Sequence, residues 1–145
     1  MQRRTFFSTL SAGALGLFGA SRAHAEDAPR QKVVYHVDDL DKVNEALANL
    51  KNHVAGVGGP GKADLRIVIN GVALRAFRKD EAEARMSSNF DGLSKAEVRF
   101  EACANTMRGM NITLADLLPG FVAAEKGGVV RIAELQMQGF AYIKP

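Results

Sequence analysis

The sequence predicts a three-layer α/β/α domain with a mostly parallel sheet of about five strands. Two observations predict it: short strand-like segments are separated by helix-like segments, and the strand-like segments are apolar rather than alternating. Of the 145 residues, residues 26–145 are enough for one domain with a single core and too few for two. We therefore expect one sheet with helices on both faces.

The first half of the domain is predicted to be a strand, a helix and a second strand. Residues 32–37 are β-branched, aromatic and mostly apolar, which is typical of a buried strand. From residue 40 to 54 apolar side chains recur every three or four positions after a capping aspartate, which predicts a helix. The glycine-rich segment 56–61 follows a helix, so it is interpreted as a turn and not as a phosphate-binding loop. Residues 63–69 form the second strand.

The second half continues the same alternation. The charged stretch 80–85 is interpreted as a solvated helical face, and residues 89–92 show no clear pattern. The remaining elements are predicted in the order strand, helix, capped turn, strand, helix and strand, at residues 97–102, 105–110, 113–116, 121–124, 129–136 and 140–143.

Residues 1–25 are predicted to be a cleavable export signal. They contain the charged start Arg3-Arg4-Thr5-Phe6, an uncharged stretch from Ser8 to Ser21, and the cleavage pattern Ala23-His24-Ala25. The stretch is too short and too rich in glycine for a membrane span. Paired arginines followed by phenylalanine match the twin-arginine type, which exports folded proteins. We expect a periplasmic protein exported by that route.

Removing the signal also removes the basic excess. Residues 26–145 hold sixteen Lys and Arg against sixteen Asp and Glu, so the mature net charge is near zero. No basic stripe with interleaved aromatic residues remains. We therefore expect no nucleic-acid partner and no membrane association after cleavage.

The only cysteine, Cys103, is the best candidate for chemistry. It lies between the predicted strand 97–102 and the predicted helix 105–110, near unpaired N–H groups and the positive end of a helix dipole, which favour the thiolate. Glu101 lies on the same strand face and would raise the thiol pKa. Cysteine is also among the most commonly buried residues, so a reactive and a structural role both remain open.

Further polar residues are predicted to lie near Cys103. In open parallel sheets, reactive groups gather beyond the carboxyl ends of the strands. His36 and the pair Asn70-Gly71 follow the first two strands, and Asn105 begins the helix after Cys103. His36 is interpreted either as a proton carrier or as a histidine that is simply hydrogen-bonded.

The sequence contains no motif for a metal or a cofactor. His and Cys show no metal-ligand spacing, and there is no Cys-x-x-Cys, haem-attachment, Gly-x-Ser-x-Gly or nucleotide-binding glycine motif. Met107, Met110 and Met137 are interpreted as core residues and not as soft-metal ligands. We expect neither a cofactor nor a metal site.

Two segments resemble a known family. The run from Val98 to Met107, which contains Cys-Ala-Asn-Thr-Met, and the ending from Leu135 to Pro145, which contains Gly-Phe-Ala-Tyr-Ile, resemble the exported, single-domain branch of the DsrE/DsrF-like family. The resemblance implies a sulfurtransferase-like fold and homo-oligomers, often trimers or hexamers. It implies that Cys103 carries sulfur as a persulfide. A histidine that often follows the second strand in the family is Asn70 here.

Three functional hypotheses follow for Cys103. The first is a periplasmic sulfur carrier, which exchanges sulfane sulfur with donor or acceptor proteins and acts more as a carrier than as a turnover enzyme. The second is a non-catalytic oligomeric module that binds a small ligand or a partner and has a structural cysteine. The third is a redox sensor that forms an intermolecular disulfide.

Overall fold

The computed structural model describes residues 29–145, so the predicted export signal at residues 1–25 lies outside the described residues. These residues form one five-stranded, all-parallel sheet with the strand order β4-β3-β2-β1-β5. The strands are β1 (Gln31–Val37), β2 (Ala63–Ile69), β3 (Arg99–Cys103), β4 (Val122–Ala124) and β5 (Ala141–Ile143).

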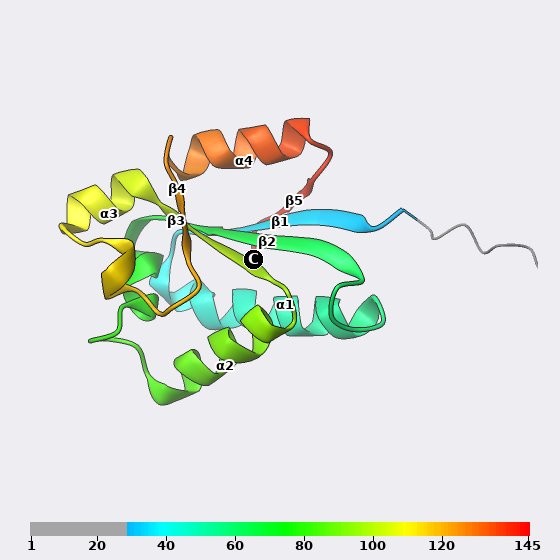
Figure 1. Cartoon of the computed structure of the whole chain (residues 1–145), viewed down its shortest axis with the longest axis horizontal. Coiled ribbons are helices and arrows are strands. Elements are labelled where there is room, and N and C mark those ends of the chain that lie inside the picture. The colour runs from blue at the N-terminus through cyan, green and yellow to red at the C-terminus, as the bar shows by residue number, and fades with distance from the viewer. Residues whose placement is uncertain (1–28) are drawn as a thin grey trace, which may run out of the picture.

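Helices cover both faces of the sheet. In Figure 1, α1 and α2 lie on one face, α4 lies on the other, and α3 lies beyond the carboxyl end of β3. The predicted three-layer α/β/α architecture is therefore confirmed. The helices are α1 (Val43–Gly56), α2 (Ala84–Lys95), α3 (Ala104–Met110) and α4 (Gly128–Met137), with short 3-10 turns at η1 (Leu40–Lys42), η2 (Gly71–Phe77) and η3 (Leu114–Asp116).

The two faces of the sheet differ in what they bury. Under α1 and α2, apolar side chains of β1, β2 and β3 form the main core with a cluster of aromatic rings from Phe77, Phe90, Phe100 and Phe121. Under α4 the core is small and consists of Val34, Val68, Ile132, Leu135 and Phe140. The β3 and β4 end of this face instead carries charged side chains, which line a groove beside α4.

One sequence-based interpretation was wrong, and one segment without a prediction proves to be helical. The acidic stretch 80–85 is not a helical face, because α2 begins only at Ala84 and the residues before it form a turn in which Arg78 binds Asp80 and Glu81. Residues 89–92, for which the sequence pattern predicted no element, lie inside α2, with Phe90 buried. Asn, Asp and Gly have low helix propensity, but α2 is stabilised by burying Met86, Phe90 and Leu93.

The expectation that Met137 is a core residue was also wrong. Met107 is buried as predicted, and Met110 packs against the core, but Met137 is 88% exposed at the end of α4. Within residues 29–145, no helix has the length and apolar character needed to cross a bilayer.

Candidate functional site

The strand order brings the ends of β1, β2 and β3 together at one edge of the sheet. Residues His36, Val68 and Glu101 are Cα partners across these three strands. At this edge the His36 ring lies between Asn70 and Tyr142: its Nε2 is 2.6 Å from Asn70 Oδ1 and its Nδ1 is 2.8 Å from the Tyr142 hydroxyl. An Nε2–H that donates to Asn70 leaves Nδ1 to accept from Tyr142, so both ring nitrogens are satisfied by neutral histidine.

Cys103 lies where two helices begin. It is the N-cap residue of α3, and its Sγ accepts a hydrogen bond of 3.1 Å from the backbone N–H of Gly128, the first residue of α4. The Gly128 contact has full hydrogen-bond geometry, whereas α3 makes no formal cap bond to the Cys103 side chain. The Cys103 side chain is only 5% exposed.

The surroundings of Cys103 favour its thiolate. Burial raises the pKa of the Cys103 thiol, but the hydroxyl and N–H groups of Thr106 and the N–H groups of Gly128 and Asn105 together outweigh burial and lower that pKa below its ordinary value. The positive ends of two helices add to this effect. The sulfur is therefore buried, but among hydrogen-bond donors rather than in a purely apolar space.

Thr106 connects the thiol to the second strand. Its Oγ1 accepts a hydrogen bond of 3.0 Å from the N–H of Gly71, so its own hydroxyl proton is free to be donated toward Cys103. Gly71 has a φ of +57°, and a Cβ there would come within 3.0 Å of the Asp38 carbonyl oxygen. A glycine at this turn thus allows the end of β2 to approach both β1 and α3.

Glu101 does not oppose the thiolate as the sequence suggested. Its carboxylate is only 3% exposed and binds the Arg131 guanidinium through two hydrogen bonds, of 2.5 and 3.1 Å. Arg66 lies 3.5 Å from the same carboxylate and also binds Asp64. The negative charge of Glu101 is therefore balanced by two arginines.

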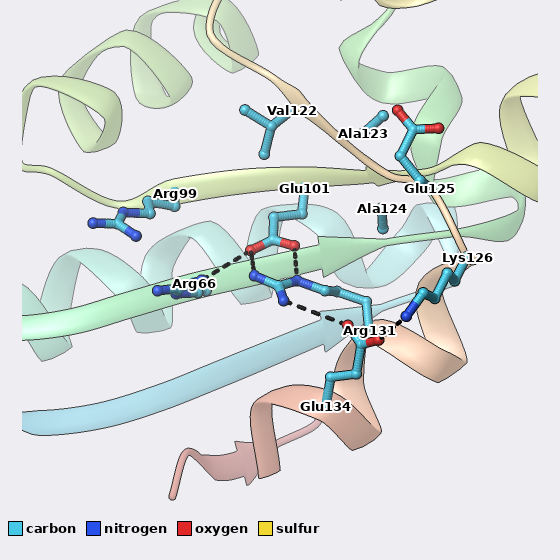
Figure 2. A pocket seen from close by; sticks show the side chains of 10 residues that line it. All are labelled: Arg66, Arg99, Glu101, Val122, Ala123, Ala124, Glu125, Lys126, Arg131 and Glu134. Atoms are coloured by element: carbon cyan, nitrogen blue, oxygen red, sulfur yellow. Dashed lines mark hydrogen bonds and ion pairs between the residues drawn. The ribbon is translucent and has the colours of Figure 1, made fainter. Parts of the chain in front are cut away.

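A groove of about 510 Å³ lies beside this ion-pair network. Figure 2 shows that β4 forms one wall, Glu101 and Arg66 lie on the sheet below, and Arg131 and Glu134 reach in from α4. Lys126 binds Glu134 at 3.0 Å. Most cations of the groove are thus already paired with carboxylates of this chain.

The glycine pair at the start of α4, Gly127 and Gly128, allows this helix to approach Cys103 closely. Gly127 has a φ of +96°, where side chains are rarely tolerated, and a Cβ on Gly128 would lie 3.4 Å from the Cys103 Cβ and 3.5 Å from the Asn70 Cβ. The absence of both side chains lets the first N–H of α4 approach the sulfur.

The structure brings most of the sequence-predicted site residues together. His36, Asn70, Gly71 and Cys103 meet at the predicted edge through the contacts above. Asn105 contributes its backbone N–H, while its exposed side chain binds Arg108. Glu101 lies one step back on β3 and faces α4. The chemical roles of all these residues stay predictions.

Sequence reasoning missed four residues of the site. Two of them, Thr106 and Gly128, could have been identified from the sequence. Thr106 lies three residues after the N-cap, where a backbone N–H points back at the cap side chain. Gly128 is part of a glycine pair at a predicted helix start. The sequence contains no local pattern that identifies Arg131 or Tyr142, because their partners are 30 and 106 residues away along the chain. Among residues 29–145, no group of three or more His, Cys, Asp or Glu could hold a metal ion.

Fold and site together define a small α/β protein with one thiol held at two helix starts. The chain belongs to the DsrE/DsrF-like family, whose model matches residues 39–145. This family is linked to sulfur metabolism in general.

Two solved structures are similar to the chain. The protein of unknown function MTH1491 from Methanobacterium thermoautotrophicum is 32% identical, with a TM-score of 0.69 over 79% of this chain and 99% of that one. The ychN protein from E. coli is 16% identical, with a TM-score of 0.59 over 79% of this chain and 99% of that one, and shows the fold alone. No curated protein matches the sequence.

Proposed function

We propose that this protein is a periplasmic sulfur carrier that holds sulfane sulfur as a persulfide on Cys103. The observation that supports the proposal best is the hydrogen bond from the Gly128 N–H to Cys103 Sγ, at the meeting point of two helix starts. A persulfide is an anion at neutral pH, and backbone N–H groups at helix starts stabilise anions.

The transfer step needs no oxidant or cofactor. The Cys103 thiolate attacks the outer sulfur of a donor such as thiosulfate, and a new S–S bond forms. The S–S bond within the donor breaks, and sulfite leaves with its electron pair. The products are the Cys103 persulfide and sulfite, so charge and atoms balance without redox chemistry from outside.

The groups that favour the thiolate are also available to the persulfide. Gly128 donates to the inner sulfur in the resting protein, and the Thr106 hydroxyl and the amides of Asn105 and Thr106 lie at the positive end of α3. These groups are the donors available to the outer sulfur of the persulfide.

The periplasmic location is part of the proposal. It is supported by the twin-arginine pattern Arg3-Arg4-Thr5-Phe6 and the cleavage pattern Ala23-His24-Ala25. Export in the folded state suits a thiol site assembled from three strands and two helices, because the site exists only after folding. A sulfur donor or acceptor protein in the same compartment completes the proposed role.

Mass spectrometry of protein treated with thiosulfate or polysulfide tests the function. We expect native protein to gain one sulfur atom on Cys103, removable by a thiol reductant, and C103S to gain none. The proposal fails if sulfur never appears on Cys103 or appears equally on a denatured control.

A second candidate is a ligand-binding or partner-binding module with a structural cysteine. It is favoured by one observation, the 5% exposure of Cys103. This candidate predicts that a thiol reagent modifies Cys103 only after unfolding, and that C103S keeps the oligomeric state and loses stability alone. Fast modification of the native protein contradicts it.

A further inference from the structure

Two contacts dock α4 onto β3. Glu101 and Cys103 lie on the same face of β3, two residues apart, and Gly128 and Arg131 lie on the same side of α4, one turn apart. Gly128 meets Cys103 through the N–H to Sγ bond, and Arg131 meets Glu101 through the bidentate ion pair. The spacing along the strand thus matches the spacing along the helix.

The two contacts differ in the number of bonds that fix the helix. Cys103 Sγ accepts a single hydrogen bond from Gly128, whereas Arg131 and Glu101 form a bidentate guanidinium–carboxylate pair, which also fixes orientation. The Glu101 carboxylate is buried, and hydrogen bonding to it raises the pKa of Arg131, which keeps the guanidinium charged. Gly127 and Gly128 have no side chains that could anchor the beginning of α4 themselves.

We infer that the Glu101–Arg131 ion pair is a positioning device, which holds the start of α4 on β3 and so keeps the Gly128 N–H at Cys103 Sγ. Figure 2 shows the Arg131 side chain crossing from α4 to the sheet to meet Glu101. Both are positioning residues, because neither touches the sulfur. The benefit of this role for the thiolate rests on the proposed function. The position of the helix itself can be measured without any sulfur transfer.

An effect of charge alone must be separated from positioning. The charged groups around the thiol are Glu101 on β3, Arg66 on β2, Arg108 on α3, and Arg131 and Glu134 on α4. His36 on β1 faces Asn70. Removing Arg131 alone unbalances Glu101, and this negative charge would disfavour the thiolate even if α4 stayed in place. Removing both charges cancels that effect and still removes the anchor.

The test therefore compares R131M, the double variant E101Q/R131M and the control K126M. Lys126 also binds α4, through Glu134, but contacts neither Glu101 nor Cys103. Two readouts are measured on the folded protein: hydrogen exchange of the Gly128 amide by NMR, and the pH midpoint of Cys103 alkylation.

We expect R131M to speed Gly128 exchange by about tenfold and to move the alkylation midpoint upward by about one pH unit. The double variant should keep both changes, and K126M should match the wild type. The inference is overturned if R131M matches K126M in both readouts, or if the double variant returns to the wild-type midpoint and exchange rate, because charge alone would then explain the effect.

Circular dichroism shows whether each variant is folded. If R131M does not fold, R131K takes its place. Lysine keeps the positive charge but cannot form the bidentate contact, so the Gly128 amide should exchange faster than in the wild type and by less than tenfold. Wild-type exchange in R131K contradicts the inference. Failure of the proposed function looks different, since wild-type protein would then gain no sulfur while Gly128 exchange still responded to R131M.

Discussion

Thr106 shows how a single residue can serve both the fold and the site. Its Oγ1 accepts from the Gly71 N–H at the end of β2, and its hydroxyl and N–H favour the thiolate of Cys103. A hydroxyl can do both because it has one proton to donate and two lone pairs to accept. A valine has nearly the same shape and keeps the backbone N–H, but its side chain can neither donate nor accept a hydrogen bond.

T106V is therefore expected to raise the thiol pKa and to leave the Gly71 N–H without an acceptor. The first effect should slow native alkylation at mildly acidic pH by several-fold, and the second should lower the free energy of unfolding by roughly 1 kcal/mol. T106S, which keeps the hydroxyl, is the matched control. Equal alkylation rates in T106V and T106S would show that the hydroxyl does not act on the sulfur.

The lowered pKa of Cys103 also predicts a pH dependence of stability. Between the native pKa and the pKa of about 8.5 in the unfolded chain, the unfolded state binds more protons, so the free energy of unfolding rises with pH. This contribution is fully present above the unfolded pKa and is lost as the pH falls through the native one. Urea titrations of wild type and C103S should therefore diverge as the pH is raised through this window. A constant difference contradicts a lowered native pKa.

At the scale of elements, the start of α4 is the most constrained segment of the site. Gly127 has a φ of +96° and a ψ of 157°, a conformation that is essentially confined to glycine. The clash of an added Cβ with Asn105 Nδ2 is relieved by moving an exposed side chain, so the backbone conformation is the main constraint.

G127A is expected to destabilise the protein by about 1–3 kcal/mol through this backbone strain and to shift the Gly128 N–H away from Cys103. The control is G109A in α3, where a Cβ meets nothing within 4 Å and the residue is helical, so stability should be unchanged or slightly higher. Thermal unfolding of both variants measures the difference. Equal destabilisation by the two substitutions would contradict this account.

The elements also show what the sequence could predict. The order of strands and helices followed from periodicity, because β1, α1 and β2 bury most of the residues that their pattern marked as apolar. Leu40 is an exception: it precedes α1 and is 41% exposed. The helix α2 was missed because its residues have low helix propensity and its stability comes from tertiary packing, including Phe90 stacked on the distant Phe121. Cys103 and its strand-end neighbours could be placed from topology, but the partners Arg131 and Tyr142 could not.

At the scale of the whole molecule, α4 has an apolar outer surface. Val129, Val130 and Met137 are exposed on this helix, and Met137 is the most exposed of them at 88%. A surface of this kind is typical of a protein interface. Together with the short strands β4 and β5 at the two sheet edges, it agrees with the homo-oligomers that the family resemblance implies, and we propose that α4 forms their interface.

Light scattering of residues 26–145 at micromolar concentration should give a mass above that of one chain. M137K is expected to lower that mass, because a charged side chain replaces an apolar one at the proposed interface. K51M, which changes an exposed residue on the opposite layer, is the control. A strict monomer in the wild type rules out the oligomer at this concentration.

The pH profile of Cys103 alkylation in the native protein tests the central claim most directly, namely that two helix starts hold a buried sulfur as an anion. The account predicts that the folded protein reacts without denaturant and that its midpoint lies below that of a free cysteine, about 8.5. A thiol that reacts only after unfolding, or a native midpoint at or above the free value, would contradict it.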